Sequence, residues 1–220
     1  MGKGRSPSPY LLGLYRQYLD DQDTASFLAK ASRRYTQGTL QRLVENDSPA
    51  VRRSAVLALG LLGDYESNAT LGRALQDEDR TVRTLAQTSI RNVWNRAGSD
   101  EQRQTLATLI RLNSAQHFEE VVQRSGELIQ QAPWFAEAWN QRAIAHFSLG
   151  RYAEAIRDCH QTLEINPYHF AAAAGMGQAY LQLGNTHSAL ESFRRALRLN
   201  PDLEAVRVQV SRLTRLIEDK

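Results

Sequence analysis

The sequence lacks the disulfides that stabilise small secreted domains and the long apolar stretches that cross a bilayer. Its only cysteine is Cys159, so no disulfide can form within the chain. No stretch approaches the roughly 20 apolar residues that cross a bilayer, and no secretory signal follows the first residues. Prolines number 6 and glycines 13 in 220 residues, and β-branched runs are scarce. We therefore expect an all-helical cytoplasmic protein without a membrane span.

Catalytic and metal-binding patterns are also missing. The five histidines have no spacing that would place two ligands on one metal ion, and no glycine-rich loop is set to hold a phosphate. The formal net charge is only +3, although residues 1–98 carry 14 Lys and Arg against 10 Asp and Glu. Apolar residues make up 42%, which is enough for a core. We expect no enzyme, no cofactor and no metal.

An internal repeat dominates the rear half, where the stretch 136–167 corresponds to the stretch 170–201. Five features coincide when the two are superposed: Ala143 with Gly177, His146 with Tyr180, Gly150 with Gly184, Ala155 with Ala189, and Asn166-Pro167 with Asn200-Pro201. A repeat of this length indicates stacked pairs of amphipathic helices, with glycine between the two helices and proline after the second. Their buried stripe is expected to include Ile144, Ile156, Leu183 and Leu190.

These residues resemble the tetratricopeptide repeat. The matching positions are Trp139, Ala143, Gly150, Tyr152, Ala155 and Pro167, then Gly177, Tyr180, Gly184, Ala189, Phe193, Ala196 and Pro201. The departures are Cys159 in place of a bulky aromatic, Thr162 in place of alanine and Thr186 in place of tyrosine. Residues 102–133 fit a divergent first unit, in which Gln116 stands where glycine is usual. The resemblance implies a non-catalytic scaffold that binds a protein or peptide partner.

A second and slightly shorter repeat occupies the front half, where the stretch 40–59 corresponds to the stretch 71–90. The paired positions are Leu40 with Leu71, Val44 with Leu75, Val51-Arg52 with Val82-Arg83, Ala55 with Ala86, and Leu59 with Ile90. Ser48 and Asp79 are predicted to cap the second helix of each unit. The pattern resembles HEAT-like repeats. In that family an arginine bonds to the acidic turn of a neighbouring repeat, a role implied here for Arg52 and Arg83 with Asp47, Asp77 or Asp79.

The front-half resemblance leaves two alternatives open, because HEAT-like stacks include nucleic-acid-binding proteins and phycobilin lyase subunits. A basic surface for nucleic acid would draw on Arg33, Arg34, Arg52, Arg53, Arg73, Arg80, Arg83, Arg91 and Arg96. Acidic residues are interleaved with these arginines, so nucleic acid is not the expected partner. A lyase would need a pigment site, and no nucleophile is evident.

The expected fold is an all-α solenoid of helix hairpins. Its parts would be a flexible N-terminus at 1–9, a helical cap at 10–37, HEAT-like repeats at 38–98, three tetratricopeptide units at 99–201, and a closing helix at 202–220. The closing helix would cover the last repeat with an apolar stripe and be polar outside. Only residues 97–99 separate the arrays, and Ser99 with Gln102 fits a capping box. We expect one continuous solenoid; the sequence leaves the oligomeric state open.

The resemblance implies a binding groove along the first helix of each unit. The groove-facing positions would be Arg103, Leu106, Ile110, Asn113, Glu137, Asn140, Ile144, Phe147, Ala171, Ala174, Gln178 and Leu181. Chaperone-binding members clamp a C-terminal carboxylate here with lysines, arginines and asparagines. Only Arg103 and Asn140 are analogues in this chain, so we predict that this clamp is absent.

The predicted groove is rather apolar and suits an extended peptide or an amphipathic helix. Asn140 is the strongest single candidate, because an amide at this position can hold a peptide backbone. For four groove positions a role in the core is the alternative: Ile110, Ile144, Phe147 and Leu181. Trp134-Phe135, in the turn between repeats, would either pack between repeats or form a hot spot for the partner.

Overall fold

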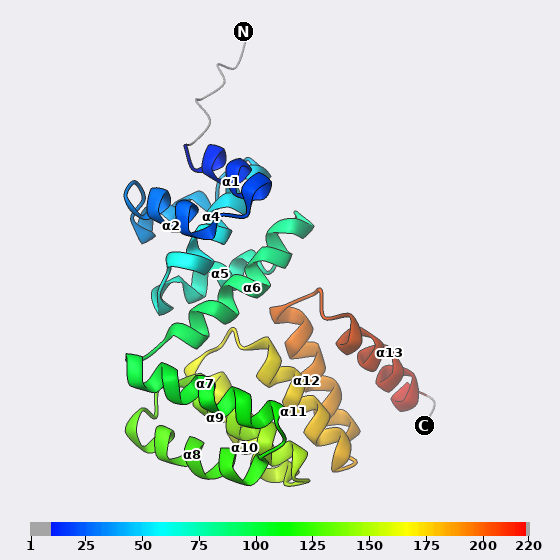
Figure 1. Cartoon of the computed structure of the whole chain (residues 1–220). Helices are drawn as coiled ribbons and strands as arrows, with labels where there is room; N and C mark the ends of the chain where they lie inside the picture. Colours follow the sequence, from blue (N-terminus) through cyan, green and yellow to red (C-terminus); the bar gives the residue numbers. More distant parts are fainter. Residues whose placement is uncertain (1–9, 219–220) are drawn as a thin grey trace. The chain divides into compact units, whose positions relative to one another are not determined.

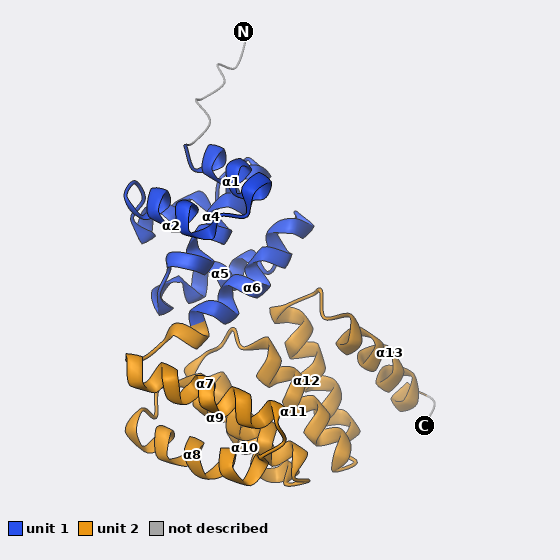
Figure 2. Cartoon of the chain, viewed as in Figure 1, with its two compact units in different colours: residues 1–93 blue, residues 94–220 orange. Residues whose placement is uncertain are grey.

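The structure, a computed structural model, describes residues 10–218 and shows helices connected by short turns (Figure 1). No strand occurs within that range, which confirms the all-α prediction. The predicted flexible segment 1–9 lies outside the described residues. The chain divides into two compact units, residues 1–93 and 94–220 (Figure 2). The border between the units, at 93/94, falls inside the helix Arg80–Arg96. The predicted domain border, at 98/99, lies just after that helix.

Unit 1 is built from short hairpins. Its elements are α1 (Tyr10–Asp21), α2 (Thr24–Ser32), α3 (Gln37–Leu43), α4 (Pro49–Leu62), the 3₁₀ turn η1 (Tyr65–Ser67), α5 (Asn68–Ala74) and α6 (Arg80–Arg96), which runs on into unit 2. The apolar residues that the front-half repeat pairs are all buried. A β-carbon on Gly60 of α4 would lie 2.1 Å from Ser89 Oγ of α6, so glycine is required for this close approach.

The predicted helix caps are present with one exception. Asp79 accepts the Val82 N–H at 2.9 Å and so caps α6, and Ser99 forms both bonds of a capping box with Gln102. Pro49 is the first residue of α4, as expected, but the Ser48 side chain makes no capping bond. The prediction for Ser48 was right about its position and wrong about its bond.

Unit 2 stacks its helices in chain order. They are α7 (Asp100–Ser114), α8 (Phe118–Gln131), α9 (Ala136–Ser148), α10 (Tyr152–Ile165), α11 (Phe170–Gln182), α12 (Thr186–Leu199) and α13 (Glu204–Glu218). Each helix packs against the next, and α9 also touches both α7 and α11. This is the arrangement of a helical solenoid, with α7, α9 and α11 as the first helices of three hairpins.

The same turn ends the first helix of all three hairpins. Gly150 and Gly184 have φ angles of 75° and 72°, and Gln116, one period earlier, has a φ of 63°. Each lies in the left-handed region that glycine enters without steric cost. The hairpin α7–α8 therefore follows the geometry of the other two, although its sequence departs from their pattern.

The apolar stripe of unit 2 is partly misassigned by the sequence. Ile156 and Leu190 are buried, but Ile144 is 43% exposed and Leu183 is 53% exposed. Leu183 follows the last residue of α11, where the helix turns away from the core. The expectation that Ile144 and Leu183 are buried was therefore wrong.

The last helix, α13, packs on α12 as predicted for a closing helix. Val206 and Leu213 are buried, and Leu203, Val210 and Ile217 pack against the same core cluster. Its outer face is not wholly polar, because Val208 and Leu216 are 58% and 43% exposed. The prediction of a polar outer face needs that correction.

Candidate functional site

The twelve predicted groove positions are distributed over α7, α9 and α11, four on each helix. The structure brings five of them together around one hollow of about 210 Å³ between α9, α10 and α11. The five are Asn140, Ile144, Phe147, Ala171 and Gln178. The walls are completed by Ala143, Ser148, Ala155, Cys159 and Gly175. Since a cavity of about 150 Å³ holds a benzene ring, this hollow is large enough for one apolar side chain.

This hollow exists because Cys159 stands where the next repeat has the aromatic Phe193. In the last hairpin, Phe193 of α12 is fully buried against Gly177, where a β-carbon would lie 2.6 Å from the ring. One period earlier the pair is Ala143 and Cys159, and both line the hollow. The small thiol leaves open the volume that a ring fills in the next repeat. The departure at Cys159 is thus the sequence signal for this hollow.

Cys159 is a wall of the hollow and not a nucleophile. Its side chain is 4% exposed, and burial raises the pKa of the thiol to about 12, with the nearby Asp158 carboxylate adding to the effect. A thiol with a raised pKa is a weak nucleophile, because the thiolate is the reactive form.

A buried polar group lies at the start of α9, behind the hollow. Glu137 is 5% exposed, and its carboxylate accepts bonds from Asn140 at 3.0 Å, from Gln141 at 3.4 Å and from His169 Nε2 at 2.9 Å. Burial by itself would raise the pKa of Glu137, but the His169 ring and the two amides outweigh it and hold that pKa below its usual value. The Glu137 carboxylate therefore holds the side chains of Asn140, Gln141 and His169 in place near the start of α9.

His169 connects this group to the neighbouring helices. Its Nδ1 accepts the Ala172 N–H at 3.0 Å, so the ring proton sits on Nε2 and is donated to Glu137. The ring is 1% exposed and stacks on Trp94, with centroids 4.3 Å apart and planes inclined by 17°. The sequence did not single out His169; only its position before α11, where a cap belongs, pointed to it.

The Asn140 side chain is held in place by a hydrogen bond within the protein. Its amide nitrogen donates to Glu137, which fixes the side chain, while the residue lines the hollow. A fixed amide loses less entropy when it binds a ligand than a mobile one. This arrangement is compatible with the predicted contact between Asn140 and a peptide backbone.

The four predicted groove positions on α7 mainly make contacts within the protein. Leu106 is buried in the core cluster of the first hairpin, and Ile110 packs against that cluster. Arg103 donates to the Gly98 carbonyl at 2.8 Å and pairs with Asp100. Asn113 donates to the Gln141 carbonyl at 3.0 Å, which joins α7 to α9. None of these four lines the hollow.

The remaining groove positions, Ala174 and Leu181 on α11, are half-buried and pack against the core cluster of the last two hairpins. Phe147 has a double role. It packs edge-on against Tyr152, with ring centroids 5.4 Å apart, and it also lines the hollow. In the turn between repeats, Phe135 is 1% exposed and Trp134 is 53% exposed, so only Trp134 presents its ring to solvent.

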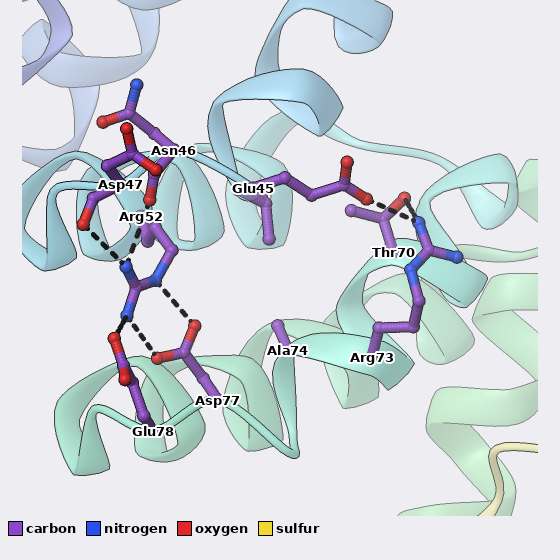
Figure 3. A pocket seen from close by; sticks show the side chains of 10 residues that line it. Glu45, Asn46, Asp47, Arg52, Thr70, Arg73, Ala74, Asp77 and Glu78 are labelled. Atoms are coloured by element: carbon purple, nitrogen blue, oxygen red, sulfur yellow. Dashed lines mark hydrogen bonds and ion pairs between the residues drawn. The ribbon is translucent and has the colours of Figure 1, made fainter.

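In unit 1 the predicted arginine ladder, in which an arginine bonds to the acidic turn of a neighbouring repeat, is present at Arg52 (Figure 3). Arg52 grips both oxygens of Asp77 at 2.7 and 2.8 Å and reaches Glu78 at 3.1 Å. It also donates to the carbonyls of Asn46 and Asp47, each at 3.1 Å. These five bonds match the five N–H groups of a guanidinium. One buried side chain thus joins the turns of two successive repeats.

Arg83 donates to the Asp77 carbonyl in the turn of its own repeat, at 2.9 Å, so a bond from Arg83 to a neighbouring repeat stays a prediction. Arg53 adds a pair that the sequence did not predict, donating to Asp79 Oδ1 at 2.9 Å. Beside the ladder is a hollow of about 430 Å³, which the Arg73–Glu45 pair borders on its other side (Figure 3). Several front-half arginines are thus engaged within the protein, which weakens the case for a basic nucleic-acid surface.

Within the described part of the chain, no group of three or more Asp, Glu, His or Cys side chains is placed to hold a metal ion. His146 lies 3.9 Å from Asp158, and burial lowers the pKa of its ring. Among the same residues, no helix has the length and apolar character needed to cross a membrane.

Known families match both halves of the chain. Residues 36–124 match HEAT repeats, and residues 134–202 match the tetratricopeptide repeat. The hairpin at 100–131 lies mostly within the first match, so its assignment as a tetratricopeptide unit stays a prediction. Its left-handed turn at Gln116 supports that assignment.

Curated relatives match part of the chain. A TPR repeat-containing protein of Rhizobium etli is 34% identical over 87 residues, 40% of this chain and 43% of that protein. The Hsp70-Hsp90 organizing protein of Triticum aestivum is 31% identical over 94 residues, 43% of this chain and 16% of that protein. The chain thus spans less than half the length of these curated relatives.

Among solved structures, the first TPR domain of Spaghetti (RPAP3), bound to an HSP90 peptide, is similar with a TM-score of 0.52 and 18% identity. The alignment covers 55% of this chain and 96% of that one. At this identity the likeness supports the helical-repeat fold.

Proposed function

Because the chain carries HEAT repeats followed by tetratricopeptide repeats, we propose that it is a non-catalytic scaffold that binds a peptide or helix of a partner protein along α9 and α11. The single observation that carries this proposal is the hollow of about 210 Å³ beside the half-buried Phe147 and the exposed Ile144. It is an apolar socket with a fixed amide, Asn140, at its wall. Such a socket takes one apolar anchor of a peptide while the amide binds the peptide backbone.

Relatives point to the same class of function. A solved neighbour holds an HSP90 peptide, and a wheat relative is named as an organizing protein for two chaperones. In this chain no basic side chain lines the hollow, so it offers no clamp for a C-terminal carboxylate. We therefore propose an apolar anchor as the main determinant of recognition, in place of a C-terminal carboxylate.

The HEAT repeats supply a second docking surface in this proposal. The hollow of about 430 Å³ beside Arg52 has charged side chains in its wall, among them the buried Arg52–Asp77 pair. A partner could contact both units and gain affinity through the two linked sites.

The test is a selection from a random peptide library against the full chain, followed by fluorescence-polarisation titration of the selected peptides. The diagnostic variant is Gly175→Leu. A β-carbon at Gly175 would meet only Cys159 Sγ, at 3.8 Å, so the helix tolerates a side chain there while leucine fills the hollow. We expect selected peptides to share an apolar residue and to bind this variant at least about tenfold more weakly.

The matched control is Gly13→Leu on α1, where a β-carbon meets nothing within 4 Å. It adds the same side chain to a helix outside the proposed groove, and peptide affinity should be unchanged. Equal affinity for wild type and Gly175→Leu would refute the proposed groove. Turnover of a substrate by the purified chain would refute the scaffold itself.

A further inference from the structure

A second hollow in unit 2, of about 530 Å³, lies between α10, α11 and α12 and is rich in basic side chains. It is lined by His160, Met176, Tyr180, Ser188, Glu191, Ser192, Arg194, Arg195 and Arg198. Three arginines within five positions of α12 face one space whose lining holds a single acidic residue. Like charges three and four residues apart on a helix repel each other.

The internal repeat provides a control for this feature, because every position in 170–201 has a counterpart in 136–167. The counterparts of Met176 and Ser192 are Arg142 and Asp158. In the earlier repeat Arg142 grips Asp158 with two bonds of 2.8 Å, and its Nη1 would be 3.9 Å from a β-carbon built on Gly126. A guanidinium paired with a carboxylate thus occupies the position that Met176 and Ser192 leave open.

The charge of the surface is reversed between the two repeats. On α12 the six positions from 188 to 198 that line the hollow hold three arginines and one glutamate, a net charge of +2. Their counterparts on α10 hold one arginine and three acids, Glu154, Asp158 and Glu164, a net charge of −2. The same fold therefore carries opposite net charge at these positions on consecutive repeats, and the later repeat combines the positive charge with the hollow.

The basic hollow is distinct from the proposed peptide groove. The two hollows share α10 and α11 but have no residue in common. On α11 the groove uses Ala171, Gly175 and Gln178, whereas the basic hollow uses Met176 and Tyr180. At about 100° per residue, these two sets lie on nearly opposite faces of the helix.

We propose that this basic hollow is a binding site for an acidic peptide segment of a partner protein. The arginines supply charge-assisted hydrogen bonds to carboxylates, and Tyr180 and Ser188 add hydroxyl groups at the wall. Nucleic acid fits less well, because non-specific binding draws on a longer track of about 6–10 phosphate contacts.

The experiment titrates the full chain with fluorescein-labelled octaglutamate, followed by fluorescence polarisation. The diagnostic double variant is Arg195→Gln with Arg198→Glu, which installs the residues that positions 161 and 164 carry in the preceding repeat. Because those residues are accommodated there by the same fold, we expect the variant to fold. Its affinity for octaglutamate should fall at least about tenfold, and wild-type binding should weaken as salt is raised.

The matched control is Arg212→Gln with Arg215→Glu on α13, which makes the same change of net charge outside the hollow. Binding within about twofold of wild type is expected for this control. A second variant, Met176→Arg with Ser192→Asp, keeps the net charge but copies the Arg142–Asp158 pair into the hollow, and it should also lose binding.

Three results would overturn the proposal: no binding of octaglutamate, equal losses in the diagnostic and control variants, or stronger binding of a single-stranded octanucleotide than of octaglutamate. Gly175→Leu should leave octaglutamate binding intact. Failure of the apolar groove and failure of this basic site are thereby told apart.

Discussion

Gln116 has a left-handed backbone, with a φ of 63°, at a position where the next two repeats have glycine. Only the β-carbon disfavours this conformation, because Gly150 and Gly184 have open space around them. We expect Gln116→Gly to stabilise the protein by about 0.5–1 kcal/mol, the released strain exceeding the entropy gained by the unfolded chain. The reverse change, Gly184→Gln, should cost about 1 kcal/mol. Urea denaturation measures both, and stabilisation by Gly184→Gln would contradict this account.

Asp79 has two separable roles, as the cap of α6 and as the partner of Arg53. The Arg53 guanidinium is the main reason that the pKa of Asp79 falls to about 2. Solvent reaches both side chains, which are 17% and 34% exposed, so the pair is worth about 1 kcal/mol. We expect Asp79→Asn, which keeps a good cap, to cost about 1 kcal/mol, and Asp79→Ala to cost about 2 kcal/mol.

The stability contributed by the Asp79–Arg53 pair should depend on pH. The folded-state pKa lies below the unfolded value, so the ionised pair stabilises the fold above about pH 4 and loses that contribution as pH falls toward 2. The difference in unfolding free energy between wild type and Asp79→Asn should shrink over that range. A constant difference from pH 6 to pH 2.5 would argue against the ion pair.

At the scale of elements, the two helices of each hairpin meet at a corresponding pair of residues, which fills the space in the last hairpin and leaves a hollow in the one before. Gly177 faces Phe193 in the last hairpin, and Ala143 with Cys159 takes the same place in the one before. A β-carbon on Gly177 would lie 2.6 Å from the Phe193 ring, which is fully buried. Helix separation and side-chain size are therefore set together in each hairpin.

A double-mutant cycle tests this coupling. Gly177→Ala alone should destabilise the protein by about 1–3 kcal/mol through overpacking. In the background of Phe193→Cys, the same change recreates the Ala143–Cys159 pair and should be neutral or slightly stabilising, because alanine favours helix over glycine. We expect a coupling energy of about 2 kcal/mol from denaturant unfolding. Additive effects would show that the two residues do not constrain each other.

At the scale of the molecule, the two compact units have cores of their own, and repeat arrays gain stability mainly from neighbouring repeats. A substitution should therefore be felt near its own repeat. In hydrogen exchange followed by mass spectrometry, we expect Asp79→Ala to speed exchange in α4–α6 and leave α11 and α12 unchanged. Gly177→Ala should do the reverse. Equal acceleration throughout the described residues would show that the chain opens as one cooperative unit.

The helices, their order and all predicted caps except the Ser48 bond could be predicted from the sequence, because they depend on local information. Each of the two repeats returns the same apolar spacing at a fixed interval, and the apolar residues paired by the front-half repeat are buried without exception. The capping box at Ser99 needs only a serine and a glutamine one helical turn apart. The prediction that Arg52 bonds to Asp77 succeeded because the resemblance to HEAT-like repeats supplied a contact between neighbouring units.

The candidate sites depended on contacts between residues distant in sequence. The sequence placed Glu137 in the groove, but a histidine from the start of the next hairpin, His169, holds it in the interior. The sequence placed Ile144 both in the buried stripe and in the groove; it is 43% exposed and lines the hollow. The sequence by itself determined an array of helix pairs, since periodicity is local. Only the tertiary structure decided which spaces between the helices stay open, because packing is settled by side chains that meet across repeats.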